Sequence, residues 1–302
     1  MTNYKIIQKR NIWLTFSGVL FVTLGLALLV WGFKYGIDFT GGSLLEVKFL
    51  ANRPVVSELA SKLADLKLSS LIIQPVEESN IIFRFQQTDE ETHQAVLAKL
   101  NELAKTDNGQ SALEELRFDS VGPSIGAELK RKSLYAIFFV LLAILLYITY
   151  AFRKVSKPVA SWKYGTTALI ALVHDAVITL GIFAALGKFY NIEINTAFVA
   201  AVLTVLGYSV HDTIVVFDRL RENLPKSNED FEGTVNISLN QTLVRSINTS
   251  LTVLLVLGSI ILFGGSSIRT FALTLAIGIF FGTYSSIFVA PPILVIWEKL
   301  KR

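Results

Sequence analysis

Residues 207–223 read GYSVHDTIVVFDRLREN and place an imidazole and a carboxylate inside an otherwise apolar segment. Residues 194–210, which overlap the start of this stretch, carry no charged side chain. His211 and Asp212 follow, and apolar residues return before the charged cluster that begins at Asp218. This pattern predicts a membrane-spanning helix that carries an ionisable residue.

One face of that helix is predicted to be polar. At about 100° per residue, Thr204, Tyr208, His211 and Asp212 fall within one wedge of roughly 100°. A charge near the bilayer centre costs on the order of 2.5 to 3.5 kcal/mol, so this wedge must face protein or water. An unpaired Asp212 would take up a proton or hydrate its surroundings, and we therefore expect it to be proton-sensitive.

The composition of the 302 residues places the chain in a membrane. Hydrophobic residues make up 52% and charged residues only 17%, and the mean hydropathy is +0.53, which is far too hydrophobic for a soluble protein. The net charge of +4 does not indicate nucleic-acid binding, because the basic residues cluster between apolar segments. The absence of cysteine excludes disulfides and thiolate metal sites, and with three scattered histidines we expect no metal and no cofactor.

Six apolar segments are long enough to cross a bilayer, which takes about 20 residues per helix. They are residues 11–33, 133–152, 164–187, 194–217, 246–268 and 270–297. The first segment exceeds the core of a signal peptide, about 7 to 15 residues, and lacks a small-x-small cleavage site, so we expect a retained anchor. The predicted organisation is one transmembrane helix at 11–33, an insert at 34–132, and helices two to six with their loops at 133–302.

Basic residues predict the orientation of these helices. Fourteen Lys and Arg residues lie in the two termini and in the loops on the same side, whereas the short loops of the other side hold only Lys188 and Arg269. The positive-inside rule then places both termini in the cytoplasm and the insert outside. Three basic residues at 130–132 lie on the outer side against the rule, which long translocated domains obey poorly.

The insert is predicted to be a small α+β domain. Strands are expected at residues 43–50, 71–75, 80–87 and 113–121, with one helix after Pro54 and a second opened by a capping box of Thr88 and Glu91. The order β-α-β-β-α-β is typical of the ferredoxin-like fold. We expect His93, near the start of the second helix, to be a solvated or capping residue.

The third span also carries polar residues near its middle. Asp175 lies about eleven residues, or roughly 16 Å, beyond Tyr164, with His174 before it and Thr179 one turn later. A buried carboxyl group here would either titrate or make a structural polar contact that fixes helix packing. The sequence leaves both interpretations open.

A positive partner for Asp212 is predicted at the start of the fifth span. Arg245 precedes a polar run at 248–252 and would reach Asp212 if the two helices are neighbours. Such a partner within about 4 to 6 Å favours the charged carboxylate, whereas burial favours the protonated form, so moving Arg245 would load and release a proton. The alternatives are that Asp212 lies at the interface near a helix end and that Arg245 is a positive-inside anchor.

Several small residues and prolines indicate how the chain packs and turns. Gly278 and Gly282 form a small-xxx-small pair that predicts close helix packing, and the same is expected of Gly181 and Gly207. The pair Pro291 and Pro292 would break or kink the last span. In the stretch DFTGG, which comprises Asp38, Phe39, Thr40, Gly41 and Gly42, the glycines permit a positive φ and a tight turn into the first strand.

Six ordered motifs together resemble the SecF family, the smaller membrane subunit of the bacterial SecD/SecF protein-export complex. They are DFTGG at 38–42, VGPSIGAEL at 121–129, VHD at 173–175, GYSVHDTIVVFDRLREN at 207–223, NQTLVRSINTS at 240–250 and GTYSSIFVAPPIL at 282–294. The resemblance covers most of the chain. It implies a membrane protein of the resistance-nodulation-division type, half of a pseudo-symmetric twelve-helix assembly whose other half is SecD.

The same resemblance implies a function and partners. We expect export of preproteins across the bacterial plasma (inner) membrane, driven by the proton-motive force, with the SecYEG channel and the SecA motor as partners and without enzymatic activity. By this resemblance Asp212 would carry the proton and Arg245 would work with it. From their positions in the spans, we expect His211, Asp175, His174 and Tyr208 to modulate these two residues. Structural roles are expected for the family-motif residues Asp38, Gly41, Gly42, Gly207, Gly278 and Gly282. The sequence departs from the commoner family pattern at His211, where many relatives carry Asn.

Three other functions fit parts of the sequence. A proton-coupled exporter of small molecules or lipids would need a larger external portion than one domain of about ninety residues. An intramembrane aspartyl protease would use Asp175 and Asp212, but such proteases carry Tyr-Asp and Gly-x-Gly-Asp sequences, whereas both carboxylates here follow a histidine. A passive structural subunit would tolerate loss of the Asp212 charge.

Overall fold

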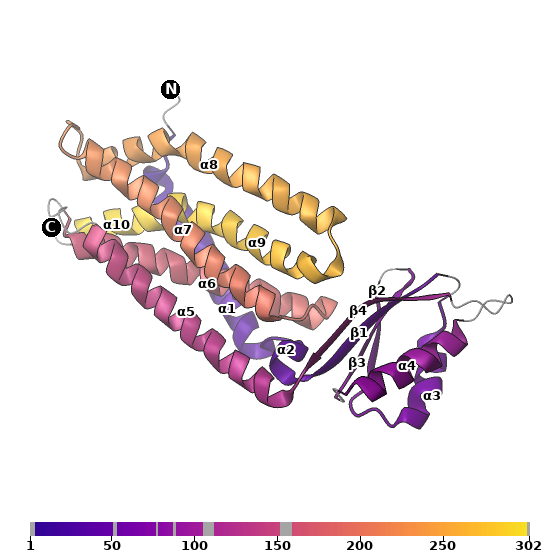
Figure 1. Ribbon diagram of the computed structural model, residues 1–302. Coiled ribbons are helices and arrows are strands. Elements are labelled where there is room, and N and C mark those ends of the chain that lie inside the picture. Colours follow the sequence, from indigo (N-terminus) through magenta and orange to yellow (C-terminus); the bar gives the residue numbers. More distant parts are fainter. Residues whose placement is uncertain are drawn as a thin grey trace. The chain divides into compact units, whose positions relative to one another are not determined.

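The computed structural model describes residues 4–50, 53–76, 78–86, 89–104, 112–151 and 159–300. It divides into two compact units. The membrane unit comprises Met1–Lys34 and Ser133–Arg302, and the sheet unit comprises Tyr35–Lys132. The predicted fold class is confirmed, because these described residues are mostly helical and include six helices long and apolar enough to cross a membrane and one small antiparallel sheet (Figure 1).

The membrane unit is built from long helices. After a short 3-10 turn, η1 (Ile7–Lys9), they are α1 (Arg10–Trp31), α5 (Pro123–Ala151), α6 (Ser161–Tyr190), α7 (Thr196–Asn223), α8 (Phe231–Phe263), α9 (Ser266–Phe288) and α10 (Ala290–Lys299). The start of α5, up to Lys132, belongs to the sheet unit. The last candidate span comprises α9 and α10 together. The break between them at Val289, just ahead of Pro291 and Pro292, confirms the expected interruption, since a proline cannot donate the helical hydrogen bond.

Helix α8 begins at Phe231, fifteen residues before the span that was predicted from the apolar segment at 246–268. Asp230 caps its first turn by accepting a hydrogen bond from the Gly233 backbone N–H at 2.8 Å. Phe231, Val235 and Leu239, spaced four residues apart, are buried in an apolar core, and polar residues lie between them in the sequence. The first half of α8 is therefore an amphipathic helix, held by packing on one face, which a search for continuous apolar residues misses.

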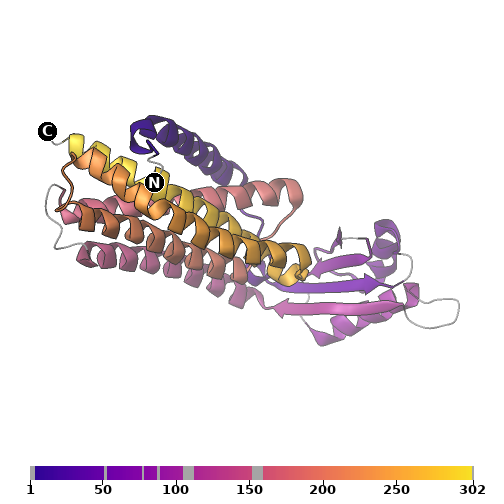
Figure 2. The same ribbon diagram turned by 90° about the horizontal axis from the view of Figure 1, so that it is seen from above.

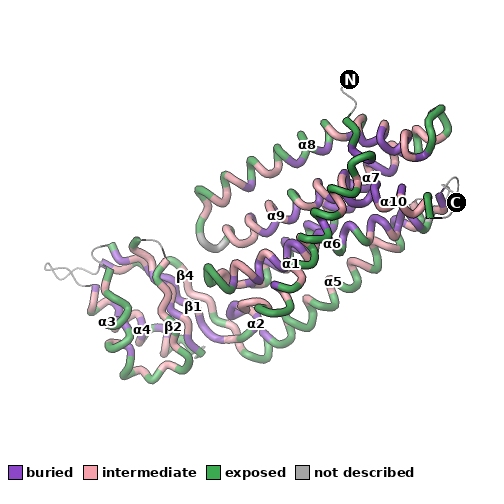
Figure 3. Tube along the Cα trace, turned by 180° about the vertical axis from the view of Figure 1, so that it is seen from behind, coloured by how far each residue is buried: buried purple, intermediate pink, exposed green. Residues whose placement is uncertain are grey.

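Helix α9 is the centre of the membrane unit. It packs against α6, α7 and α8, while α1 packs on α6, and Figures 1 and 2 both show α9 alongside α8. The most buried spans are those formed by α6, by α7, and by α9 with α10, whereas α1, α5 and much of α8 expose their side chains (Figure 3). The exposed apolar side chains of α1 and α5 form surfaces suited to lipid or to another membrane protein.

Glycines permit the closest helix approaches. A Cβ atom at Gly278 would lie 2.3 Å from Val205 Cγ2 on α7, and one at Gly181 would lie 2.3 Å from the backbone oxygen of Leu24 on α1. These contacts confirm the close packing expected at both glycines. At Gly207 the expectation is wrong within this chain, because a Cβ there would meet no described atom within 4 Å.

The sheet unit holds a four-stranded antiparallel sheet in the order β2-β3-β1-β4. Its strands are β1 (Gly42–Phe49), β2 (Ile72–Val76), β3 (Asn80–Phe85) and β4 (Leu113–Val121), and its helices are α2 (Ile37–Thr40), α3 (Val56–Leu63), η2 (Ala64–Leu66) and α4 (Glu90–Leu103). Apolar side chains of β1, β3, α3 and α4 form one core. The expected ferredoxin-like order of strands and helices is confirmed.

The turn into β1 requires its two glycines. Gly41 has φ +75° and Gly42 has φ +114°, values that favour glycine. A Cβ atom would lie 2.7 Å from Pro123 Cα at Gly41 and 2.7 Å from the Phe85 backbone oxygen at Gly42. The positive φ values expected here are confirmed, and Asp38 lies just before them on α2.

The start of α4 differs from the sequence prediction. Thr88 of the proposed capping box lies outside the described residues, and the N-cap is Asp89, which accepts a hydrogen bond from the Thr92 backbone N–H at 2.8 Å. Hydrogen bonds from Thr92 hold the pKa of the Asp89 carboxyl below its usual range. The solvated or capping role expected of His93 is wrong, because its side chain is buried and its ring stacks on Phe118 with centroids 3.7 Å apart.

Candidate functional site

Asp212 lies between three helices of the membrane unit. Its side chain on α7 is buried, with 8% exposure. Ser246 on α8 donates a hydrogen bond to Oδ1 at 2.7 Å, and Ser286 on α9 donates one to Oδ2 at 2.5 Å. Each carboxylate oxygen thus has a hydroxyl donor from a different helix, an arrangement that compensates a buried negative charge.

Arg245 is not bonded to Asp212 in this structure. Among the described residues no ion pair or hydrogen bond joins the two side chains, and Arg245 is exposed. It lines a cavity of about 280 Å³ together with Asp218, Glu222 and Gln241. The physical reason is helical rotation, since neighbouring residues on α8 point about 100° apart and Ser246 is the one that faces Asp212.

The polar wedge expected on α7 divides between the interior and the surface. Thr204 and His211 are exposed, whereas Tyr208 is partly buried and its hydroxyl lies 3.2 Å from Ser250 Oγ on α8. The Ser250 hydroxyl in turn contacts Thr283 on α9. Tyr208 is therefore part of a hydroxyl chain one turn from the serines that hold Asp212.

A second buried carboxylate lies between α6, α7 and α9. Asp175 is fully buried. His174 Nδ1 lies 2.9 Å from its Oδ1, and the hydroxyls of Ser209 and Ser285 each donate to its Oδ2 at 2.6 Å. Thr179, one turn further along α6, has a buried hydroxyl without a hydrogen-bond partner among the described residues. Asp175, like Asp212, therefore accepts hydrogen bonds from serine hydroxyls of two neighbouring helices.

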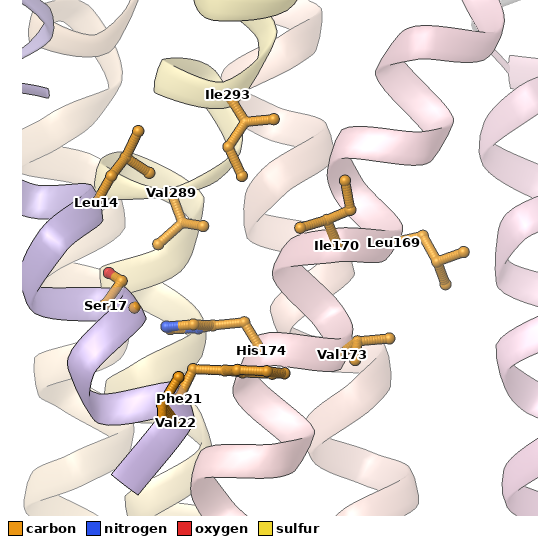
Figure 4. Close-up of a pocket in the computed structure, with 11 residues that line it drawn as sticks. Leu14, Ser17, Phe21, Val22, Leu169, Ile170, Val173, His174, Val289 and Ile293 are labelled. Atoms are coloured by element: carbon orange, nitrogen blue, oxygen red, sulfur yellow. The ribbon is translucent and has the colours of Figure 1, made fainter. Parts of the chain in front are cut away.

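His174 also borders a cavity of about 430 Å³ beside α1. Figure 4 shows its ring extending from α6 toward Ser17 and Phe21 of α1, and its ring is nearly parallel to that of Phe21, with centroids 6.3 Å apart. The Nε2 atom is buried without a hydrogen-bond partner among the described residues. The rest of the lining is largely apolar, so His174 supplies the polar end of this cavity.

The sequence did not predict that any of the four serines would contact a carboxylate. Ser209, Ser246, Ser285 and Ser286 are small polar residues inside or beside apolar spans, and Ser209 lies three residues before Asp212. That spacing indicates a shared helix face. The pairing across helices was not predictable, because it depends on which helices become neighbours.

Two carboxyl groups of the membrane unit, those of Asp175 and Asp212, have similar surroundings. Each carboxylate is buried and held by hydroxyls, which donate to the charged form and can reorient when a proton arrives. The described residues contain no group of three or more His, Cys, Asp or Glu side chains that could hold a metal ion. Asp175 and Asp212 are held by different serines, and no hydrogen bond joins them directly among the described residues.

These features define a class of protein: a multi-pass helical membrane protein with an α+β unit between its first two spans and carboxyl groups buried between helices. Residues 101–300 match the family described as protein export membrane protein SecD/SecF, C-terminal, and residues 27–49 match the SecD/SecF GG motif. The chain belongs to the SecD/SecF family of protein export membrane proteins. The resemblance inferred from the six motifs is thereby confirmed.

Similar proteins agree with this assignment. The protein translocase subunit SecF of Thermobaculum terrenum is 44% identical over 306 residues, covering 97% of this chain and 94% of the relative. The subunit of the same name from Sebaldella termitidis is 37% identical over 308 residues, covering 99% of this chain and 93% of the relative.

Solved structures give the same result. The crystal structure of SecDF, a translocon-associated membrane protein from Thermus thermophilus, matches 99% of this chain with a TM-score of 0.81 and 30% identity. A structure of SecDF in a super-membrane-facing form matches with a TM-score of 0.69. The chain spans 39% of the length of each of these SecDF chains.

Proposed function

We propose that the chain is a subunit of a protein translocase that uses the proton-motive force to assist preprotein export, together with a SecD subunit. The observation that carries this proposal is the burial of Asp212 between hydroxyl donors from α8 and α9. The names of its relatives, protein translocase subunit SecF, supply the process in which such a proton site would work.

Protonation of Asp212 would change how α7, α8 and α9 hold one another. The charged carboxylate accepts from both Ser246 and Ser286. The protonated form is itself a donor and accepts more weakly. Ser286 has a second acceptor in place, because its hydroxyl also lies 2.9 Å from the Thr283 backbone oxygen. A proton would therefore release α9 and α8 from α7 without leaving the Ser286 hydroxyl unpaired.

Arg245 would act in a second arrangement of α8. A rotation of this helix by about 100° exchanges Ser246 for its neighbour Arg245 on the face toward α7. A guanidinium at that position favours the charged carboxylate. We infer that proton release from Asp212 accompanies the approach of Arg245. We further infer that the rotation of α8 changes the positions of α1 and α5, the two helices that connect directly to the sheet unit along the chain.

The orientation and the other partners are part of the same proposal. The excess of Lys and Arg in the termini and in alternate loops supports cytoplasmic termini and an extracytoplasmic sheet unit in the bacterial plasma membrane. A SecD subunit is supported by the SecDF chains, of which this chain matches only 39%, and by the exposed apolar side chains of α5. We propose SecYEG, SecA and the preprotein as the remaining partners. The proposed role requires no catalysis.

The proposal is tested by measuring preprotein export into inverted membrane vesicles with and without an imposed proton gradient. Vesicles that contain this chain and its SecD subunit are expected to show an increase of export by the gradient beyond that in vesicles lacking them. An ionophore that collapses the gradient should remove the increase. The same gradient effect in vesicles that lack the chain would contradict the proposal.

His211 is expected to tune the pH range of this activity. It is exposed on α7 next to Asp212, and imidazole is the side chain that ordinarily gains its charge between pH 5 and 8. Because asparagine cannot gain this charge, His211→Asn should retain gradient-driven export but change its dependence on pH. Identical pH profiles for the two proteins would show that His211 has no such role.

A further inference from the structure

Two neighbouring serines on α9 join the two buried carboxyl groups. Ser285 donates to Asp175 at 2.6 Å, and Ser286 donates to Asp212 at 2.5 Å. We propose that Asp175, with His174, is a second proton-binding site whose occupancy is coupled to that of Asp212. This inference rests on the proposed function, in which Asp212 binds and releases protons.

The hydroxyls of both serines have two acceptors within reach. Ser285 Oγ lies 3.1 Å from the Gly282 backbone oxygen, and Ser286 Oγ lies 2.9 Å from the Thr283 backbone oxygen. A hydroxyl has one proton, so it donates either to the carboxylate or to the carbonyl. Because the two serines are consecutive in one helix, a shift of α9 that loosens one carboxylate contact also changes the other.

The second link between the sites runs along α7. Ser209 donates to Asp175 at 2.6 Å and lies three residues before Asp212. Residues three apart on a helix have Cβ atoms about 5–6 Å apart. Together with the 2.6 Å hydrogen bond from Ser209 to Asp175 and the side-chain bonds, this spacing keeps the two carboxyl groups within about 12 Å of each other. At an effective dielectric constant of about 20, one negative charge at that distance changes the proton affinity of the other group by about tenfold.

The titratable groups around the pair are few. His174 on α6 contacts Asp175 directly, and Tyr284 on α9 faces away toward Ser17 and Trp13 of α1. The only charged residue of α1 is Arg10, which pairs with Glu232.

Around Asp212, α7 contributes Tyr208 and His211, and α8 contributes Arg245 as the nearest basic residue along its sequence. The hydroxyls of Ser246 and Ser286 occupy its two oxygens. No described basic side chain is bonded to Asp212. The charge of Asp212 is therefore not neutralised by a bonded partner and can act on Asp175.

His174 gives the second site a contact with the cavity beside α1. One ring nitrogen binds Asp175, while the other is buried, unpartnered among the described residues and at the border of the cavity. An imidazole can accept a proton on one nitrogen and release one from the other. His174 thus extends the Asp175 site from α6 to the wall of this cavity.

A structural role for Asp175 predicts different behaviour. A carboxyl group that only fixes helix packing keeps one protonation state over the working pH range, and its state is independent of Asp212. A coupled site titrates, and by reciprocity each carboxyl group changes the proton affinity of the other by the same factor. Measuring how each substitution changes the proton affinity of the other carboxyl group therefore distinguishes a structural role of Asp175 from a coupled proton site.

The test is infrared spectroscopy of the protonated-carboxyl band during pH titration of the full-length chain with its SecD subunit in lipid. Asp175→Asn and Asp212→Asn identify the two bands, and unchanged thermal unfolding of both variants confirms that they fold. Loss of the Asp212 charge is expected to lower the proton affinity of Asp175 by about tenfold, and Asp175→Asn to lower that of Asp212 equally. Ser259→Ala, which removes an exposed α8 hydroxyl bonded to the Leu255 backbone, should leave both midpoints unchanged.

An Asp175 band that does not titrate, or midpoints that do not respond to the other substitution, would overturn the inference. Export measured on the same variants separates it from the proposed function. Gradient-dependent export that is lost in Asp212→Asn without any coupled titration would support the proposed function alone. Coupled titration with unchanged gradient-dependent export in Asp212→Asn would support the second proton site and contradict the proposed function.

Discussion

Asp212→Asn is expected to abolish the gradient-dependent part of preprotein export in membrane vesicles while leaving the ATP-dependent part intact. Asparagine has nearly the same shape; its oxygen can accept from one of the two serine hydroxyls that contact Asp212 in the parent, and its NH2 group can donate to the other hydroxyl oxygen. It cannot bind and release a proton at neutral pH. The substitution therefore removes the proposed coupling with little change in packing.

The control for this variant is Glu229→Gln, which removes a carboxylate from the loop between α7 and α8. It should retain the full gradient effect, and Asp212→Glu should retain part of it because the carboxyl group is kept. Equal stimulation by the gradient in the parent and in Asp212→Asn would show that Asp212 does not couple protons to export.

The second large effect is expected from Gly278→Leu, which would separate α9 from α7. Even a Cβ atom at this position would lie 2.3 Å from Val205 Cγ2, and one at Gly282 would lie 3.0 Å from Ser209 Cβ. Forcing extra atoms into a packed interior costs about 1–3 kcal/mol and occasionally more. Because the shift moves Ser285 and Ser286 away from their carboxylates, gradient-driven export should fall together with stability.

Thermal unfolding of the purified protein in detergent measures this effect, with Gly258→Leu as the matched control. Gly258 lies in the apolar part of α8, and a Cβ atom there would meet no described atom within 4 Å. The control variant should unfold close to the parent temperature and Gly278→Leu several degrees lower. Equal unfolding temperatures for both variants would contradict the close α7–α9 packing.

Much of the architecture was predictable because it depends on local composition. Long apolar segments predict membrane helices whatever they pack against, and the alternation of strands and helices in the insert predicts its sheet order. The two carboxyl groups at Asp175 and Asp212 stood out because charges inside apolar spans are costly. Their burial in the structure agrees with that reasoning.

The contacts of the site were less predictable because they depend on helix neighbours and helix rotation. Arg245 was the expected partner of Asp212, but the adjacent Ser246 occupies that position. His93 was expected at the surface, yet Phe118, which is distant in sequence, covers its ring. Gly207 was expected in a helix contact, and no described helix of this chain lies within 4 Å of where its Cβ would be.

Proton movement through the reconstituted protein tests the central claim most directly. The chain and its SecD subunit would be placed in liposomes containing a pH-sensitive dye, with an imposed gradient and a membrane potential held constant. The parent is expected to acidify the lumen faster than protein-free liposomes, and Asp212→Asn is expected to match the protein-free rate. Proton flux that is equal in the parent and in Asp212→Asn would contradict a proton-coupling role for this carboxyl group.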